Sequence, residues 1–328
     1  MTRRLVVLRA LGLGDLLTAV PALRALRRAF PDHETVLVAP ARLADAAAAT
    51  GVVDRLLPAE APGRAVPARI DWPWPTPDIA VDLHGNGPLS LRPLEALNPS
   101  RLLAYARPDG PEWCEDEHER HRWCRLLGSY GIPADPADLR IPAPDAHPSV
   151  PGATIVHPGA DAAARRWPAE RFGAVGSALC AAGHRVVVTA GAGEGPLARR
   201  VAQCAGLPAS SVLGGAADVP FEELAALVAG ARAVVVGDTG LAHLATALGT
   251  PSVVLFGPVA PRLWGPPADP RHRVLWHGDP GGVPRPGDAH GDRPDERLLR
   301  ITPAEVVAAV DRLPGAGHGP LVAAGRLP

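Results

Sequence analysis

One segment gathers side chains that could bind a polar ligand: GDTGLAHLATALGTPSVVLFGP, residues 237–258. Three valines at 234–236 come directly before it and predict a buried strand, and GDTG then predicts a turn into a helix. We expect Asp238 or Thr239 to cap this helix, because their oxygens can accept hydrogen bonds from its free N–H groups. His243 lies four residues beyond Thr239, so the imidazole and the hydroxyl share one side of the helix.

The start of this helix suits an anion, since unpaired N–H groups and a partial positive charge face outward at the end of a parallel strand. Gly240 would let the backbone approach a ligand closely. The Asp238 carboxylate could accept hydrogen bonds from sugar hydroxyls, and His243 could donate one to a phosphate. A capping aspartate and a histidine packed in the core are the alternative interpretation.

A second junction, HPGADAAARRWPAERF at 157–172, follows a predicted strand at 153–156 and leads into a helix that Pro168 opens as its first residue. Arg165 and Arg166 precede this helix, where guanidinium groups and free N–H groups together suit a pyrophosphate. Solvated surface arginines are the alternative.

The motif LGLGDLL at 11–17 follows an aliphatic strand at 5–8. Its pattern is GxGxxL, and Leu17 stands where a dinucleotide fingerprint needs a small residue, so nicotinamide dinucleotides are disfavoured. Asp15 falls at the start of the following helix. It is either an N-cap or a carboxylate that faces a cleft as general base for an acceptor hydroxyl.

Strands and helices alternate around these junctions, which predicts an α/β fold with parallel sheets. The expected strands lie at 5–8, 35–39, 52–57, 79–83, 153–156, 185–189, 233–236 and 252–256. The first expected helix follows a Gly-containing turn at 12–14 and runs to Phe30, and the others lie from about 41 and at 169–182, 196–205, 221–229, 240–248 and 305–310. Residues 58–77 are Pro-rich and lack either period, which predicts an irregular surface excursion.

The length of 328 residues favours two domains of roughly 150 residues each. A stretch rich in Pro, Asp and Ala at 133–151 predicts the linker between them. We therefore expect an N-terminal domain of residues 1–148, a C-terminal domain of residues 149–312 and a tail at 313–328.

The composition limits the kinds of partner that we expect for this protein. The 33 basic and 34 acidic residues nearly balance and the arginines are scattered, so nucleic acid is not expected as a partner. No apolar run approaches the ~20 residues of a membrane span, and the run before Arg9 is too short for a signal sequence. We expect a cytoplasmic protein, with peripheral membrane contact left open. The four cysteines match neither a zinc site nor a disulfide framework, and we expect no metal or other cofactor.

Three blocks together resemble glycosyltransferase family 9, the ADP-heptose:lipopolysaccharide heptosyltransferase family. They are GLGDLLTAVPALRAL at 12–26, HPGA with RRWP within 157–168, and GDTGLAHLATALGTPSVVLFGP with RLWGP within 237–266. The resemblance covers about residues 3–276. It implies the GT-B fold, in which two Rossmann-like domains face each other across a cleft and the C-terminal one binds the donor. It also implies metal-free transfer from a nucleoside-diphosphate sugar, with inversion at the anomeric carbon.

The resemblance also assigns roles to single residues. Asp15 matches the aspartate proposed as the catalytic base, and Arg165 matches the basic residue that binds the donor pyrophosphate, with Arg166 beside it. The other donor contacts it implies are Glu194 near the nucleoside and Asp238, Thr239, Gly240 and His243 at the sugar and phosphates. Acceptor-side candidates are Gly14, His84 and Asn86.

The donor implied is ADP-linked heptose or a related sugar, and the acceptor is a glycan, a lipid-linked saccharide or a small molecule. Two alternatives stay open: a sugar-nucleotide 2-epimerase of the same architecture, and a non-catalytic nucleotide-sugar-binding protein. Because cleft enzymes close around their ligands, a ligand-free structure is expected to hold Asp15 well away from Asp238.

Overall fold

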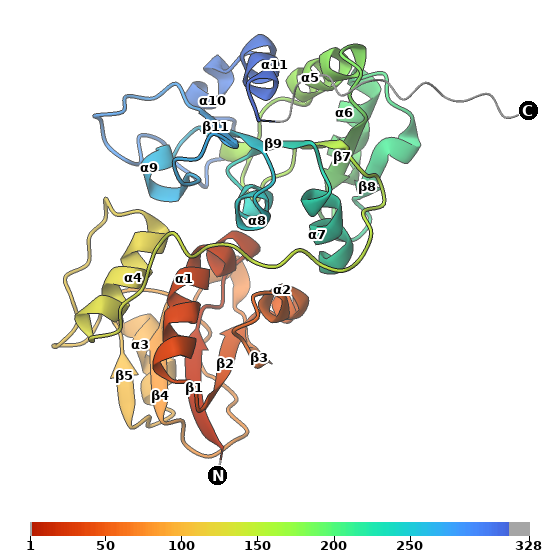
Figure 1. Ribbon diagram of the computed structural model, residues 1–328. Helices are drawn as coiled ribbons and strands as arrows, with labels where there is room; N and C mark the ends of the chain where they lie inside the picture. Colours follow the sequence, from red (N-terminus) through yellow and green to blue (C-terminus); the bar gives the residue numbers. More distant parts are fainter. Residues whose placement is uncertain (1, 315–328) are drawn as a thin grey trace, which may run out of the picture.

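A computed structural model describes residues 2–314, and its first sheet comes from the N-terminal third of the chain (Figure 1). Five parallel strands lie in the order β3-β2-β1-β4-β5. Their bounds are β1 Arg3–Leu8, β2 His33–Ala39, β3 Arg55–Pro58, β4 Ile79–Asp82 and β5 Arg101–Leu103. The central strand β1 is aliphatic from Leu5 to Leu8 and buried on both faces, as a parallel sheet covered by helices requires.

The second sheet has six parallel strands in the order β11-β10-β9-β6-β7-β8. Their bounds are β6 Thr154–His157, β7 Val186–Ala190, β8 Val212–Gly214, β9 Ala233–Gly237, β10 Ser252–Leu255 and β11 His272–Leu275. Counted from β6, this is the doubly wound 3-2-1-4-5-6 order, whose progression reverses between β6 and β9. In the first sheet the progression reverses between β1 and β4. Ligands of such sheets bind at the carboxyl ends of the strands at these reversals.

Helices cover both sheets (Figure 1). The first half contains α1 Leu13–Ala29, η1 Ala41–Leu43, α2 Ala44–Ala49, η2 Pro62–Arg64, α3 Pro88–Glu95 and α4 Glu119–Ser129, where η denotes a 3₁₀ turn. The second half contains η3 Ala163–Arg165, α5 Ala169–Ala181, α6 Gly195–Cys204, η4 Ala209–Ser211, α7 Phe221–Ala229, α8 Gly240–Leu248, α9 Pro261–Trp264, α10 Glu296–Arg300 and α11 Pro303–Asp311.

The two halves pack against each other through α1 and α8, which lie side by side (Figure 1). Leu17 and Val20 of α1 belong to the same buried apolar cluster as Leu241 and Leu244 of α8. A hydrophobic contact of this kind restrains relative motion of two units more than a polar one does. The segment between α4 and β6 crosses this junction, and the Ile141 N–H donates to the Ala247 carbonyl there at 3.0 Å.

The α/β prediction with parallel sheets is confirmed, whereas several element predictions need correction. The strand expected at 52–57 is β3 at Arg55–Pro58, and Pro168 stands at the N-cap of α5 and not at its first residue. Seven elements have no counterpart among the predicted ones: α3, β5, α4, β8, α9, β11 and α10. These elements are short or carry Pro, Gly and Trp residues that interrupt the periods. The boundary near 148 stays a prediction, and residues 315–328 of the expected tail lie outside the described part of the chain.

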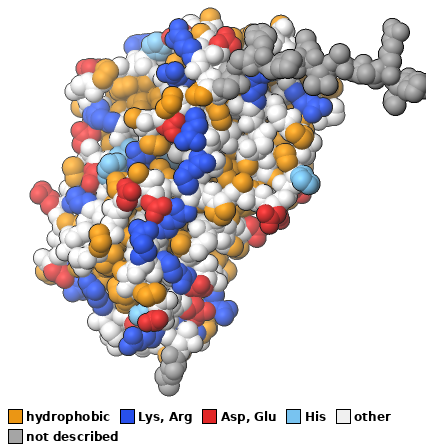
Figure 2. Space-filling view, in the orientation of Figure 1, with side chains coloured by type: hydrophobic (Ala, Val, Ile, Leu, Met, Phe, Trp, Pro, Cys, Tyr) orange, Lys and Arg blue, Asp and Glu red, His pale blue; other side chains and the backbone are white. Residues whose placement is uncertain are grey.

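Hydrophobic, basic and acidic side chains are interspersed over the face of the molecule in Figure 2. Within residues 2–314, no helix combines the length and apolar content that crossing a membrane requires.

Candidate active site

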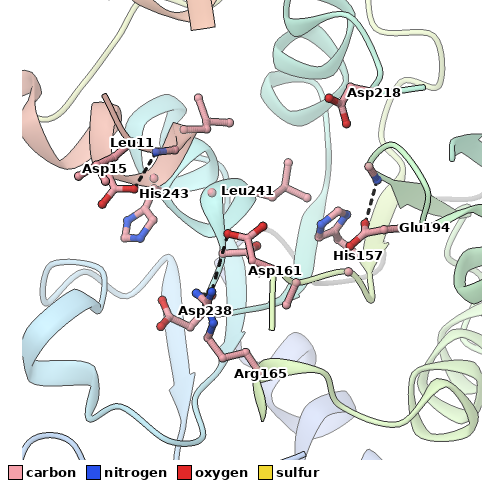
Figure 3. Close-up of a pocket in the computed structure, with 18 of the residues that line it drawn as sticks. Leu11, Asp15, His157, Asp161, Arg165, Glu194, Asp218, Asp238, Leu241 and His243 are labelled. Carbon is pink, nitrogen blue, oxygen red and sulfur yellow. Dashed lines mark hydrogen bonds and ion pairs between the residues drawn. The ribbon is translucent and has the colours of Figure 1, made fainter. Parts of the chain in front are cut away.

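A cavity of about 760 Å³ lies between the two halves, at the carboxyl ends of the strands where both sheets reverse. The N-terminal half contributes the start of α1, η1, α2 and the loop at Arg64. The C-terminal half contributes the loop after β6, the loop after β7, the start of α7 and the start of α8 (Figure 3). Six predicted donor residues line it, together with Asp15 and Gly14: Arg165, Glu194, Asp238, Thr239, Gly240 and His243.

At the start of α8, the Thr239 hydroxyl is buried and has no hydrogen-bond partner. Thr239 occupies the N-cap position with extended backbone, yet its side chain makes no cap bond. The prediction that an Asp238 or Thr239 side chain caps this helix is therefore wrong for Thr239. An unpaired buried hydroxyl costs about 1–3 kcal/mol, so its persistence at a cavity wall indicates a partner supplied from the cavity.

Arg165 lies beside the same helix start, on η3 after β6 (Figure 3). Its Nη1 donates to the Asp238 carbonyl at 3.2 Å, and its Nη2 lies 3.8 Å from the Asp161 carboxylate. Its Nε is buried and unpaired. Two unsatisfied donors, the Arg165 Nε and the Thr239 hydroxyl, thus flank the N-terminus of α8, an arrangement that suits a phosphate.

Replacing Thr239 with Val should leave the ligand-free protein as stable as the wild type or more so, because the unpaired hydroxyl is removed while the shape is kept. Affinity for a nucleoside diphosphate should fall about tenfold, the loss of one ligand hydrogen bond of roughly 1.5 kcal/mol. Melting curves and calorimetry measure the two effects. Thr246→Val on the same helix is the matched control, since the Thr246 hydroxyl donates to the Ala242 carbonyl and lies off the cavity; it should lower stability and leave affinity unchanged. Equal affinity in the Thr239 variant would contradict a phosphate at this position.

Burial raises the pKa of Asp238 to about 6; Arg165 opposes this shift and Asp15 adds to it. Burial also lowers the pKa of half-buried His243 to about 4, so its imidazole is neutral near pH 7. His243 can still donate one hydrogen bond through a ring N–H, but it adds no positive charge to the cavity.

Asp15 is the third residue of α1 and not its N-cap, which corrects the sequence prediction. One carboxylate oxygen accepts the Gly12 N–H at 3.0 Å, in a capping arrangement. The same carboxylate is ion-paired with Arg64, and the Arg9 Nη2 lies 3.9 Å away. Asp15 thus takes part in helix capping and also faces the cavity, so the two interpretations of this residue are compatible.

Arg64 was missed by the sequence analysis. It lies at the end of η2, within residues 58–77, which were expected to be a surface excursion. Its guanidinium contacts Asp15 from the first half and, at 3.3 Å, the Asp161 carboxylate from the second half. Gly63 and Arg64 both have positive φ, 65° and 63°, a strained conformation for arginine that holds the side chain toward the cavity.

The starts of α1 and α8 touch each other, so the expected separation of Asp15 from Asp238 is wrong. A Cβ on Gly14 would lie 2.7 Å from the His243 Cδ2 and 3.5 Å from the Gly240 Cα. Only glycine fits at position 14 in this arrangement. The two halves are therefore in direct contact at the cavity.

Glu194 and His157 lie together further along the cavity (Figure 3). The Glu194 carboxylate accepts the Gly191 N–H at 2.9 Å, and a Cβ on Gly159 would lie 1.9 Å from it. Glycine at 159 is therefore required for this approach. The His157 Nδ1 lies 3.1 Å from the Thr189 carbonyl, and burial lowers the pKa of this imidazole.

Three predicted site residues are not part of the cavity wall: Arg166, His84 and Asn86. The Arg166 Nε donates to the Ala160 carbonyl at 2.8 Å. The His84 Nδ1 accepts the Ala10 N–H at 3.2 Å, behind the start of α1. Asn86 is exposed.

The Gly-, Pro- and Asp-rich tract after β11 forms part of the cavity wall. Nothing in its sequence predicted this position. Arg285 and His290 from this tract line the cavity. The tract is held by backbone bonds, including the Ala164 N–H to the Gly291 carbonyl at 3.0 Å. It also reaches the first half, where the Arg285 Nη1 donates to the Glu115 carbonyl at 3.1 Å.

Residues 121–281, which include α8 and the Arg165 loop, match the family model of glycosyltransferase family 9 (heptosyltransferase). This part of the chain belongs to that family. Lipopolysaccharide heptosyltransferase 3 of Escherichia coli is 34% identical over 161 residues, 48% of this chain and 46% of that protein. The chain thus spans about half the length of the curated relatives it matches.

Solved structures share the fold of this chain over nearly its whole length. A glycosyl transferase family 9 protein from Veillonella parvula has a TM-score of 0.73 at 19% identity, covering 94% of this chain and 96% of that one. The E. coli heptosyltransferase WaaC with ADP-2-deoxy-2-fluoro heptose has a TM-score of 0.62 at 20% identity, covering 94% and 99%. The expected GT-B fold is confirmed.

Proposed function

We propose that this chain is a glycosyltransferase that moves a heptose or related sugar from a nucleoside-diphosphate sugar to an acceptor hydroxyl. The observation that carries the proposal is the pair of unsatisfied buried donors, the Arg165 Nε and the Thr239 hydroxyl, at the start of α8. A diphosphate at this helix N-terminus would satisfy both. Asp238, on the same turn, would accept hydrogen bonds from the sugar, and Glu194 lies further along the cavity, where the nucleoside would extend.

In the proposed step, Asp15 takes the proton of the acceptor hydroxyl as that oxygen forms its bond to the anomeric carbon. The bond from that carbon to the diphosphate oxygen breaks, and its electron pair leaves with the nucleoside diphosphate. A single displacement of this kind inverts the anomeric centre. Arg165 and the N–H groups of α8 would neutralise the charge that develops on the leaving group, and neutral His243 would add a hydrogen bond without charge.

Arg64 adds a condition to this mechanism. The Arg64 guanidinium contacts the Asp15 carboxylate, the group that would receive the acceptor proton. The acceptor would therefore have to displace Arg64 from Asp15, and Asp161 is placed to keep one guanidinium nitrogen. Family membership favours ADP as the nucleotide and transfer without a metal. The WaaC structure, which contains an ADP-linked heptose analogue, supports the donor class.

The test begins with the donor. Melting temperatures measured with ADP-, GDP-, UDP- and dTDP-sugars should identify one that stabilises the protein, by about 2.7 kcal/mol at a hundred times its Kd. Incubation of that donor with glycan, lipid-linked and small-molecule alcohols should release nucleoside diphosphate only with an acceptor, and NMR of the product should show an inverted anomeric centre. An isomerised sugar nucleotide formed without acceptor would instead indicate an epimerase. No stabilisation by any donor would refute the proposal.

A further inference from the structure

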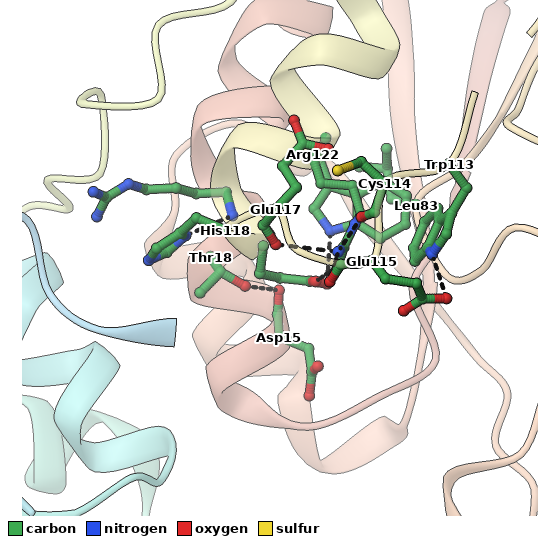
Figure 4. A network of polar contacts seen from close by, with 12 residues as sticks. Asp15, Thr18, Leu83, Trp113, Cys114, Glu115, Glu117, His118 and Arg122 are labelled. Atoms are coloured by element: carbon green, nitrogen blue, oxygen red, sulfur yellow. Dashed lines mark hydrogen bonds and ion pairs between the residues drawn. The ribbon is translucent and has the colours of Figure 1, made fainter. Parts of the chain in front are cut away.

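A buried cluster of charged groups packs against the first turn of α1 (Figure 4). Arg9, which follows β1, is 1% exposed, and Glu119 and Arg122 of α4 are also buried. The Arg9 Nη2 donates to one Glu119 oxygen at 2.9 Å, and the Arg122 Nη1 donates to the other at 2.6 Å. We call Arg9, Glu119 and Arg122 the buried triad.

Arg9 joins this triad to the turn that carries Asp15. Its Nε donates to the Asp15 carbonyl at 2.6 Å, and its Nη2 lies 3.4 Å from the Thr18 hydroxyl. The Thr18 hydroxyl in turn donates to the same Asp15 carbonyl at 3.0 Å. A third Arg9 nitrogen donates to the carbonyl of Leu83 after β4, so one side chain fixes the turn against both α4 and the sheet.

Both carboxylate oxygens of Glu119 are paired with arginines of the triad. It also accepts the Trp123 Nε1–H at 2.8 Å, and the Arg9 guanidinium lies 5.0 Å from the centroid of the Trp123 ring. Burial alone would raise the pKa of Glu119, but Arg9 and Arg122 outweigh burial and lower it, so the carboxylate is charged. The Arg9 guanidinium is thereby held in one orientation.

Stability gives no sufficient reason for this cluster. Replacing a buried arginine–glutamate–arginine triad with apolar residues of similar volume is commonly neutral or stabilising, because desolvation offsets most of the attraction between the charges. What apolar residues could not supply is the set of directed hydrogen bonds to the Asp15 carbonyl and the Thr18 hydroxyl. These bonds fix the position of the first turn of α1 relative to α4 and to the sheet.

We infer that Arg9 is a positioning residue for Asp15, held in place by Glu119 and Arg122. The inference rests on the proposed function, since it supposes that Asp15 acts on the acceptor. Arg9 itself is excluded from the cavity wall and touches neither donor nor acceptor space in the described structure. It therefore acts through Asp15 itself, by its hydrogen bond to the Asp15 carbonyl and by the 3.9 Å contact of its Nη2 with the Asp15 carboxylate.

The decisive variant replaces the whole triad, Arg9→Met/Glu119→Leu/Arg122→Met, which leaves no single charge buried without its partner. It should stay folded, with a melting temperature lowered only by the lost hydrogen bonds to the Asp15 and Leu83 carbonyls, and keep the wild-type KM for the donor. Its kcat should fall about 10²-fold, since a misplacement of about 1 Å costs that much. Arg9→Lys keeps the charge but lacks the planar fork of donors. Its kcat should lie between those of the wild type and the triad variant.

Hydrogen exchange of the ligand-free protein gives a readout that needs no activity. Amides of residues 11–20 should exchange faster in the triad variant than in the wild type. The matched control is Arg4→Met/Glu34→Leu, which removes an ion pair of 2.6 Å at the opposite end of β1 and should change neither kcat nor this exchange.

The two hypotheses fail differently. A wild-type protein without transferase activity, combined with faster exchange in the triad variant, refutes the proposed function and supports the positioning of the turn. A folded triad variant with wild-type kcat, or with unchanged exchange at residues 11–20, overturns the inference about Arg9.

Discussion

Asp15→Asn should lower the kcat of sugar transfer by about 10²–10⁴-fold, the usual contribution of a general base. The amide cannot take up the proton of the acceptor hydroxyl. Its oxygen can still receive the hydrogen bond from the Gly12 N–H at the start of α1. We therefore expect the fold and donor affinity to be retained. Steady-state kinetics with the donor and acceptor found above, together with calorimetry of donor binding, measure both parts of this prediction.

Asp161→Asn is the matched control for Asp15. Both carboxylates contact Arg64, but Asp161 is largely exposed and belongs to the second half of the chain. Its replacement should change kcat far less than Asp15→Asn does. If Asp15→Asn transfers sugar at the wild-type rate, Asp15 is a capping residue only and the base is another group.

Arg165→Ala should lower kcat by about 10²–10³-fold, the usual cost of removing one donor to a developing negative charge. Donor affinity should also fall, because the Arg165 Nε has no protein partner to which it is already committed. The effect on melting temperature should be small. In the ligand-free protein the side chain makes one hydrogen bond, to the Asp238 carbonyl, and a long contact to Asp161.

Two further variants make the Arg165 result specific. Arg166→Ala should lose less activity, since the Arg166 Nε donates to the Ala160 carbonyl and its side chain is not part of the cavity wall. Arg200→Ala, in an exposed ion pair with Glu170, controls for the loss of one positive charge and should have no effect. Equal losses of activity in the Arg165 and Arg166 variants would contradict the proposal that Arg165 stabilises the charge on the leaving group.

The sequence predicted those parts of the site that follow directly from strand-to-helix junctions. Asp238, Thr239 and His243 lie within one junction whose valines and glycines mark the strand, turn and helix without ambiguity. Arg165 follows β6, which neighbours β9 at the reversal of strand order, so the two junctions had to meet. Local pattern and the topology of parallel sheets were sufficient there.

The sequence could not predict contacts that depend on how the two halves pack. Arg64 reaches Asp15 from a Pro-rich stretch with no periodicity, across 49 positions of sequence. Arg285 comes from a tract whose composition resembles a surface loop, but backbone bonds to the second half hold it against the cavity. The contact of α1 with α8 depends on Gly14 and Gly240. In the sequence, glycines at these positions are explained equally well by a turn before each helix.

The central claim is that the cavity holds a nucleoside diphosphate at the start of α8, and a crystal structure of the protein with ADP tests it most directly. We expect the diphosphate within hydrogen-bond distance of the Arg165 Nε and the Thr239 hydroxyl, with the nucleoside extending toward Glu194. ADP bound elsewhere, or a cavity without nucleotide in crystals soaked at concentrations that saturate binding in solution, would contradict the claim.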